Sequence, residues 1–226
     1  MQIIQSIPKT WRKLVESNWS DAEISVWEYK ITSILKEGNF TPDTRNLFKA
    51  FELIDFNDVK VVILGQDPYP TAGCANGLAF STEDFVQPFP KSLLNIFKEL
   101  KRSIPEYDFP LTGNLNAWAK QGVLLMNTCL STKKGIANAH QNRGWEELTS
   151  LFLSELFEKK KNLVGMFWGN QAKKYIESID IKDHLILTSS HPSPLSVYLG
   201  FNGCNHFQLC NEYMLKNHKK TIDWQT

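Results

Sequence analysis

Four short apolar segments of the sequence are each followed by polar residues whose side chains could bind or transform a small molecule. Asp67 follows the first segment, Asn127 the second, Asn170 the third and His191 the fourth. A carboxylate and an imidazole can stabilise developing charge and move protons. A primary amide presents a hydrogen-bond donor and an acceptor side by side. This combination is typical of a pocket that recognises the edge of a nucleobase or an amide.

The apolar segments themselves have the pattern of buried β-strands. They are bounded by turn-forming residues and separated from one another by stretches of helical periodicity. Continuous apolar strands that alternate with helices indicate an α/β fold with a central four-stranded parallel sheet, flanked by helices on both faces. The predicted strands are Lys60–Leu64, Val123–Met126, Leu163–Trp168 and His184–Thr188. Because ligands of open α/β sheets bind at the carboxyl ends of the strands, we expect the polar residues to meet in one crevice.

Several helices can be placed from their caps and apolar stripes. Ser20 and Glu23 form a capping box that opens a helix, and Gly38 closes it. Thr41 followed by Pro42 predicts the start of a second helix. Further amphipathic stripes predict helices across residues 93–104, 148–156 and 207–216. We expect all these stripes to pack in the core.

The composition limits the class of protein. The chain has 226 residues, a net charge of +1, and 42% hydrophobic and 22% charged residues, which is typical of a globular domain. No repeat, low-complexity run or linker divides it, so we predict one domain over residues 1–226. No glycine-rich phosphate loop is present, which argues against NTPase and dinucleotide chemistry. There is also no nucleophile elbow of the GxSxG type.

The cysteines and histidines carry little functional signal. Four cysteines are too sparse for a disulfide scaffold, and we expect reduced thiols. Cys204, His206 and Cys210 lie close together, but their spacing matches no usual zinc pattern, so we predict no metal and no cofactor. With no secretory pattern at the N-terminus, the expected location is the cytoplasm. The histidines expected to be structural or exposed are His140, His184, His206 and His218.

A set of short motifs, several of them at strand ends, resembles the family 1 uracil-DNA glycosylases. The resemblance runs from about Trp11 to Trp224 and keeps the order of the motifs. The motifs are GQDPYP at 65–70, GLAFS at 77–81, LLMNTCLS at 124–131, GWEE at 144–147, HPSPLS at 191–196, GCNHF at 203–207 and IDW at 222–224. Any one of these strings is a weak signal, but their order and context make the set specific.

The resemblance implies an α/β fold and a reaction, the hydrolysis of the N-glycosidic bond between uracil and deoxyribose in DNA, without a metal or cofactor. It implies that Asp67 stabilises the positively charged sugar and orients the attacking water. It also implies that His191, as a neutral imidazole, donates a hydrogen bond to uracil O2 as the base departs.

Further roles follow from the same resemblance. Asn127 matches the residue that pairs with uracil N3–H and O4, Phe80 the residue that stacks on the base, and Tyr69 the residue that excludes the thymine methyl group. Gln66 is expected to add backbone and water contacts. Without the motifs, core packing would be the simpler interpretation of both aromatic residues. The residues expected to contact DNA are the phosphate-binding Ser92, Ser193 and Ser196 and the apolar wedge Leu195.

Three positions depart from the commoner pattern of the family, namely Pro70 and Asn138, where many members have His, and Asn170, where Ser is commoner. The family also implies uracil-containing single- and double-stranded DNA as partner, a proteinaceous inhibitor that mimics uracil-containing DNA, and a monomer. Two alternatives remain open. A DNA-binding relative without activity would not need Asp67 and His191, and an enzyme for other bases would not need Tyr69 and Asn127.

Overall fold

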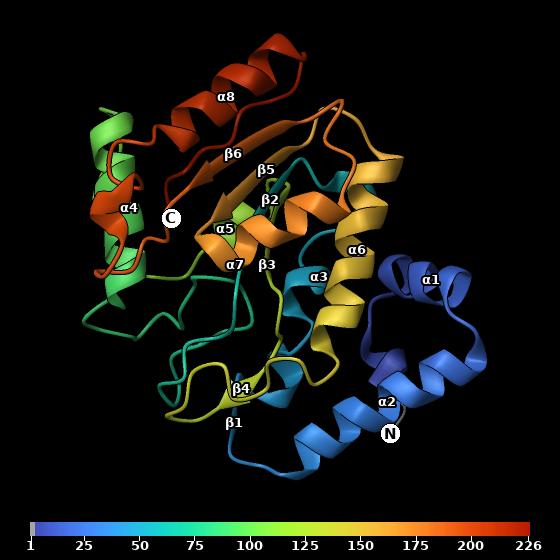
Figure 1. Cartoon of the computed structure of the whole chain (residues 1–226). Helices are drawn as coiled ribbons and strands as arrows, with labels where there is room; N and C mark the ends of the chain where they lie inside the picture. Colours follow the sequence, from blue (N-terminus) through green and yellow to red (C-terminus); the bar gives the residue numbers. More distant parts are fainter. Residues whose placement is uncertain (1–2) are drawn as a thin grey trace.

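A computed structural model describes residues 3–226, and a parallel four-stranded sheet runs through its centre (Figure 1). Strand β2 (Val61–Gly65) lies between β3 (Val123–Asn127) and β5 (Val164–Trp168), and β6 (Leu185–Ser189) follows β5, so the order is β3-β2-β5-β6. Every residue of β2, β3 and β5 is buried, which explains why these strands are continuously apolar. The predicted sheet is confirmed, with strand bounds that differ by about one residue.

Helices cover both faces of the sheet. On one side lie α3 (Lys49–Glu52) and α6 (Trp145–Lys159), and α6 also packs against α1 (Lys9–Asn18). On the other side lie α4 (Lys91–Ser103) and α8 (His206–Lys216) (Figure 1). The remaining elements are η1 (Ile3–Ser6), α2 (Asp21–Lys36), β1 (Phe40–Thr41), η2 (Thr44–Asn46), η3 (Phe56–Asp58), α5 (Asn116–Ala119), β4 (Thr132–Lys133), α7 (Asn170–Lys173), η4 (Lys174–Ser178) and η5 (Val197–Leu199). None of the helices in the described part of the chain combines the length and apolar character needed to cross a membrane.

One predicted helix start is confirmed and another is wrong. Both hydrogen bonds of the capping box between Ser20 and Glu23 are present at the start of α2. Thr41, in contrast, does not cap a helix, because it pairs with Thr132 in the small antiparallel sheet of β1 and β4. Asp43 caps the short η2 instead, by accepting a hydrogen bond from the Arg45 N–H. This pairing of distant segments overrides the local Thr-Pro signal.

The register of the central strands determines which residues meet at their carboxyl ends. Gly65, the last residue of β2, lies opposite Asn127, the last residue of β3. The backbone N–H of Thr128 continues the ladder by donating to Gly65 O at 3.0 Å, and the N–H of Cys129 donates to Gln66 O at 2.9 Å. The loops that leave these two strands are therefore held together at the same edge of the sheet.

Candidate active site

A cavity of about 570 Å³ opens at the carboxyl ends of the parallel strands. It is lined by nine of the ten residues that the sequence predicts for the site, together with Pro68, Pro70, Leu78, Ala137 and Asn138. The nine predicted residues that line it are Gln66, Asp67, Tyr69, Phe80, Ser92, Asn127, His191, Ser193 and Leu195.

Ser196 is the predicted residue that lies outside the lining. Its hydroxyl donates to His191 O at 2.8 Å and lies 3.0 Å from the hydroxyl of Ser193. In this structure Ser196 therefore supports the backbone of the loop that carries His191.

Asn127 reaches the cavity from the end of a buried strand and is 4% exposed. Its side chain fits because residue 65 has no side chain. A β-carbon built on Gly65 would lie 2.2 Å from Asn127 Oδ1 and 2.9 Å from Ala79 Cβ. The segment opposite is held as well, since the Ala79 N–H donates to Leu125 O at 3.0 Å. The amide of Asn127 thus occupies a rigid site, as recognition of a flat polar ligand requires.

Asp67 is half-buried, and its carboxylate is oriented by the backbone. Asp67 Oδ2 accepts a hydrogen bond from the N–H of Asn138 at 2.7 Å. Burial raises the pKa of Asp67 above that of an exposed aspartate, while the N–H groups of Asn138 and of Asp67 itself oppose this rise. The carboxylate is thus partly desolvated and fixed in direction, which strengthens its interaction with a nearby positive charge.

His191 is held in one tautomer by its own loop. Its Nδ1 accepts a hydrogen bond from the N–H of Ser193 at 3.0 Å, which leaves the proton of the neutral ring on Nε2. Burial lowers the pKa of His191 and favours this neutral form. Gly169 lets the loop come close, because a β-carbon there would lie 2.9 Å from His191 Cβ. The ring is thereby prepared as a neutral hydrogen-bond donor.

Two aromatic residues form the walls of the cavity. Phe80 has a positive φ of 62°, and its ring lies 5.5 Å from that of Trp168 and 5.8 Å from that of His191, between ring centroids. The hydroxyl of Tyr69 donates to Phe80 O at 3.0 Å. This bond braces a left-handed backbone conformation that a bulky residue rarely adopts. Tyr69 and Phe80 therefore act as one unit.

Helix α4 joins the cavity to the loop that carries His191. Ser92 in its first turn lines the cavity, and the amide of Asn95 donates to Pro192 O at 2.8 Å. Glu99, one turn further along, accepts hydrogen bonds from the N–H groups of Gly203 and Asn205 at 2.8 and 2.9 Å. One face of α4 therefore holds both ends of the segment between Pro192 and Asn205. Sequence reasoning missed Asn95 and Glu99, because their partners are backbone groups of distant residues.

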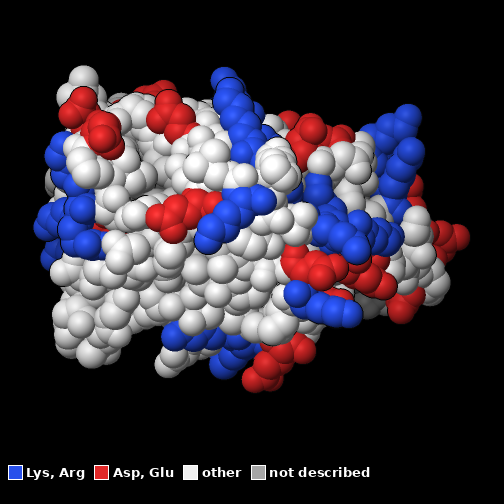
Figure 2. Space-filling view, turned by 90° about the horizontal axis from the view of Figure 1, so that it is seen from above, with Lys and Arg blue, Asp and Glu red and all other residues white. Residues whose placement is uncertain are grey.

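Leu195 lies at the rim of the cavity and is 84% exposed. Tyr198 and Leu199 in the same segment are exposed as well, and exposed apolar residues of this kind are common on protein surfaces. The chain as a whole carries no dominant charge. The chain carries 25 basic and 24 acidic residues, and the face shown in Figure 2 has both signs interspersed with uncharged surface.

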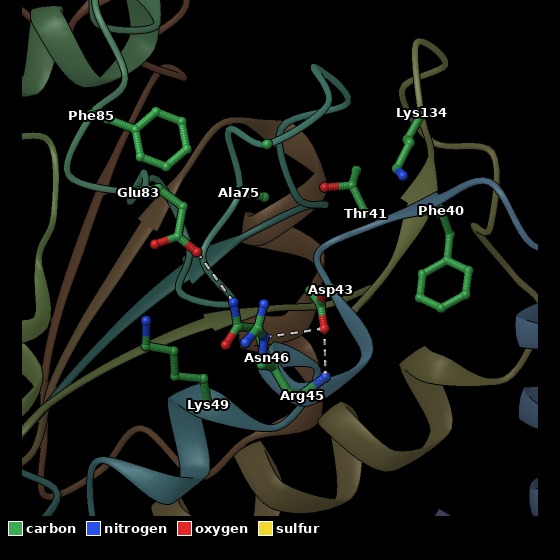
Figure 3. A pocket seen from close by; sticks show the side chains of 11 residues that line it. Phe40, Thr41, Asp43, Arg45, Asn46, Lys49, Ala75, Glu83, Phe85 and Lys134 are labelled. Carbon is green, nitrogen blue, oxygen red and sulfur yellow. Dashed lines mark hydrogen bonds and ion pairs between the residues drawn. The ribbon is translucent and has the colours of Figure 1, made fainter.

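A second groove, of about 620 Å³, lies elsewhere on the surface, and Figure 3 shows its lining. Both acidic side chains of the groove interact with neighbouring residues. Asp43 pairs with Arg45 at 3.3 Å, and Glu83 accepts a hydrogen bond from Asn46 at 3.2 Å (Figure 3). None of the predicted site residues lines this groove, whereas nine of them line the smaller cavity.

Three of the four remaining histidines have structural surroundings, and His218 is exposed. His206 Nδ1 accepts a hydrogen bond from Trp168 Nε1 at 3.0 Å, His184 Nδ1 from the Leu163 N–H at 3.1 Å, and His140 Nδ1 lies 2.8 Å from the Ser131 hydroxyl. His206 is thus engaged within the core. In residues 3–226, no three or more His, Cys, Asp or Glu side chains are grouped so that they could hold a metal ion.

Comparison with known proteins identifies the family of the chain. Residues 51–215 match the family model of the uracil DNA glycosylase superfamily. The chain belongs to this superfamily. It is 50% identical over 183 residues to the uracil-DNA glycosylase of Francisella tularensis subsp. novicida (strain U112), a match that covers 81% of this chain and 83% of that relative. The protein is thus a glycosylase that excises uracil from DNA in repair.

Solved structures resemble this uracil-DNA glycosylase over nearly its whole length. The crystal structure of mimivirus uracil-DNA glycosylase has a TM-score of 0.90 and 30% identity, and the match covers 99% of this chain and 89% of that one. A mimivirus variant in complex with UGI has a TM-score of 0.89 at 30% identity, over 99% of this chain and 91% of that one. A structure from Nitratifractor salsuginis, with a TM-score of 0.62 and 16% identity, shares the fold.

The three unusual positions of this glycosylase all lie at or beside the cavity. Pro70 lines it, and its carbonyl accepts the N–H of Gly135 at 2.8 Å. Asn138 contributes its backbone N–H to Asp67 from a left-handed conformation, which asparagine adopts more readily than most residues. Asn170 is exposed and lines a small adjoining cavity with Gln66 and His191. The departures thus leave the contacts of Asp67 and His191 intact.

Proposed function

We propose that the cavity receives a uracil flipped out of DNA, and that Asp67 and His191 carry the hydrolysis of its N-glycosidic bond. The products are free uracil and an abasic site in the DNA. The observation that carries the proposal is the fixed tautomer of His191, whose Nδ1 accepts the Ser193 N–H in the same cavity that holds the Asp67 carboxylate. His191 can donate a hydrogen bond to the departing uracil anion, and the Asp67 carboxylate can face the positively charged sugar.

In the proposed reaction, the bond between C1′ of the sugar and N1 of uracil breaks, and its electron pair leaves with the base. The Nε2–H group of His191 donates to uracil O2 and stabilises the negative charge that develops there. The Asp67 carboxylate stabilises the positive charge on the sugar and orients the water that adds to C1′. The proton that this water loses balances the protonation of the uracil anion, so the products are neutral uracil and the sugar hydroxyl. Both interactions grow stronger toward the transition state, which is the condition for acceleration.

Asn127 is proposed to select the base. Its amide oxygen would accept the N3–H of uracil while its NH₂ group donates to O4. Cytosine has no hydrogen on N3 and carries an amino group at C4, so both contacts would be left unpaired. Phe80 is proposed to stack on the base and Tyr69 to exclude a methyl group at C5, while Gln66 adds backbone contacts.

The rim of the cavity is proposed to hold the DNA. Leu195 would fill the space that the flipped nucleotide leaves, while Ser92, Ser193 and Ser196 bind phosphates directly or through their loop. Neutral donors of this kind suit a protein whose net charge is only +1. We propose uracil-containing single- and double-stranded DNA as substrates.

Further properties are proposals of the same kind. The complex of the mimivirus enzyme variant with UGI supports a proteinaceous inhibitor as a partner of this chain. We propose that residues 1–226 form a single domain. We also propose that the protein acts as a monomer, because one chain supplies all the residues to which the reaction is assigned. The four cysteines form no disulfide, which fits the proposed cytoplasmic location. We also propose that the reaction needs no metal, since a carboxylate, an imidazole and an amide supply the chemistry described.

Single-turnover measurements test the proposal. Asp67→Asn and His191→Ala are each expected to lower the rate of uracil release by roughly 10²- to 10⁴-fold, the range for one electrostatic or acid–base group. Binding to uracil-containing DNA should survive both changes. A wild-type rate in either variant would remove that residue from the mechanism.

Asn127→Asp tests base selection separately. A protonated carboxyl can donate to cytosine N3 and accept from its amino group, so this variant should release some cytosine while uracil release falls. Unimpaired uracil release with no cytosine release would show that Asn127 does not recognise the base.

A further inference from the structure

The hydroxyl of Thr132 makes two hydrogen bonds inside the protein. Thr132 is fully buried, and its Oγ1 donates to Ile136 O at 2.8 Å and accepts the N–H of Ala139 at 3.2 Å. A hydroxyl can donate once while it accepts, so both bonds form together. The hydroxyl therefore bridges the two sides of the loop that contains Asn138.

This loop carries the N–H group that contacts Asp67, although most of it faces solvent. Residues 134–138 are exposed, and Asn138 has a positive φ of 61°. The start of the loop is fixed by two backbone bonds, from Lys134 N–H to Asn39 O at 2.9 Å and from Gly135 N–H to Pro70 O at 2.8 Å. The bonds to Thr132 fix the part of the loop that lies on either side of Asn138.

Thr132 is itself a stable point of attachment. It belongs to β4 and pairs with Thr41 of β1, so its backbone cannot follow movements of the loop. From this arrangement we propose that Thr132 is a positioning residue for uracil excision, whose hydroxyl holds residues 136–139 so that the Asn138 N–H remains on Asp67. The inference rests on the proposed role of Asp67 and assigns the group that orients it.

The chemical effect is expected at the carboxylate. A hydrogen bond from a backbone N–H to Oδ2 fixes the direction of the carboxylate and favours its ionised form. If the Asn138 N–H moves away, only the N–H of Asp67 itself opposes the effect of burial, so the pKa of the carboxyl rises further and it protonates at higher pH. The other titratable groups that line the cavity are Tyr69 and His191, and neither is bonded to the 136–139 loop in the described chain.

Three substitutions separate this role from general stability. Thr132→Val keeps the shape and removes the hydroxyl, whereas Thr132→Ser keeps the hydroxyl. Thr82→Val is the matched control, because Thr82 is also fully buried but its hydroxyl has no hydrogen-bond partner among residues 3–226. The readouts are the single-turnover rate, its pH profile, inhibition by free uracil and the thermal midpoint.

Thr132→Val is expected to lower the single-turnover rate at neutral pH about 10- to 100-fold, as for the loss of a hydrogen bond to a charged group. The acidic limb of its pH profile should shift to higher pH, while inhibition by free uracil stays unchanged, since Asn127 and Phe80 are not touched. Thr132→Ser should restore the rate and the profile, and Thr82→Val should match the wild type. If Thr132→Val does not fold, Thr132→Ala replaces it.

Combining Thr132→Val with Asp67→Asn gives the decisive comparison. Since the hydroxyl is proposed to act through Asp67, Thr132→Val should have little further effect on a chain that already carries Asn at position 67. The proposal is overturned if Thr132→Val keeps the wild-type rate and pH profile, or if it lowers the rate by the same factor with and without Asp67. A wild-type rate of Asp67→Asn alone would instead overturn the proposed function.

Discussion

Gly65 and Asn127 face each other at the ends of β2 and β3, and a β-carbon on Gly65 would lie 2.2 Å from Asn127 Oδ1. Ordinary contacts between such atoms are well over 3 Å, so a methyl group and the amide cannot share this space. The Asn127 amide therefore occupies the space that a side chain at position 65 would fill.

Gly65→Ala is expected to displace the Asn127 amide while the buried strands keep their pairing. Free uracil should then inhibit the variant at least about tenfold more weakly, as when a base loses a paired donor and acceptor. Inhibition constants and thermal midpoints of Gly65→Ala, Asn127→Ala and the double variant provide the test. If Gly65→Ala binds uracil like the wild type, the amide has another position from which it can recognise the base.

The pH dependence follows from two shifts of opposite sign. The pKa of His191 is lowered from the usual 6.5 and that of Asp67 is raised, and the reaction needs neutral His191 and ionised Asp67. Both conditions fail as the pH falls, so the loss of activity lies on the acidic side. We expect the rate to fall to half of its maximum at a pH below 6.5, the pKa of an unshifted histidine. A half-maximal rate at pH 6.5 would indicate a histidine without the shift.

Tyr69→Ala is expected to admit thymine. Thymine and uracil present the same hydrogen-bonding edge, so only a steric wall can distinguish them. A clash with a rigid ring can give more discrimination than the roughly 1–3 kcal/mol of a pocket that merely lacks room for a methyl group. Release of thymine from an A·T duplex is the measurement, with uracil release reduced but retained. Tyr69→Phe is the control, because it removes the bond to Phe80 O and keeps the wall. Thymine release by Tyr69→Phe, or none by Tyr69→Ala, would contradict the assignment.

Leu195→Ala should impair action on duplex DNA more than on single strands. Unstacking the flipped nucleotide costs a few kcal/mol in a duplex, and burying a leucine side chain in the vacated space offsets about 1.5–3 kcal/mol of this cost. Because Leu195 is 84% exposed, its removal should leave the thermal midpoint unchanged. Leu111→Ala, at a leucine that is 94% exposed and lies outside the cavity, is the matched control. An equal loss on both substrates would point away from a wedge.

The sequence alone was sufficient for the sheet, because its strands are buried on both faces and therefore read as continuous apolar runs. It was also sufficient for nine of the residues that line the cavity. Asp67, Asn127 and His191 follow these strands, whereas Phe80 and Ser92 were predicted from the family resemblance alone. The helix predicted at Thr41 failed, since pairing with Thr132, 91 positions along the numbering, is not visible locally.

The supporting contacts could not be predicted for a related reason. The group that orients Asp67 is a backbone N–H, 71 residues away in the chain, and every residue except proline has one. The bonds of Asn95 and Glu99 to the segment 192–205 likewise end on backbone atoms, at separations of 97 to 106 residues. Side-chain type indicates which residues act, whereas the fold determines which residues hold them in place.

Helix α4 touches the cavity through Ser92 and holds the loop of His191 and Leu195 through Asn95 and Glu99. From Ser92 to Glu99 a helix rises about 10 Å, and it resists stretching because each turn is hydrogen-bonded. A shift of α4 would therefore move Ser92 and the loop of His191 and Leu195 together. The wall of the cavity and its rim depend on the position of one helix.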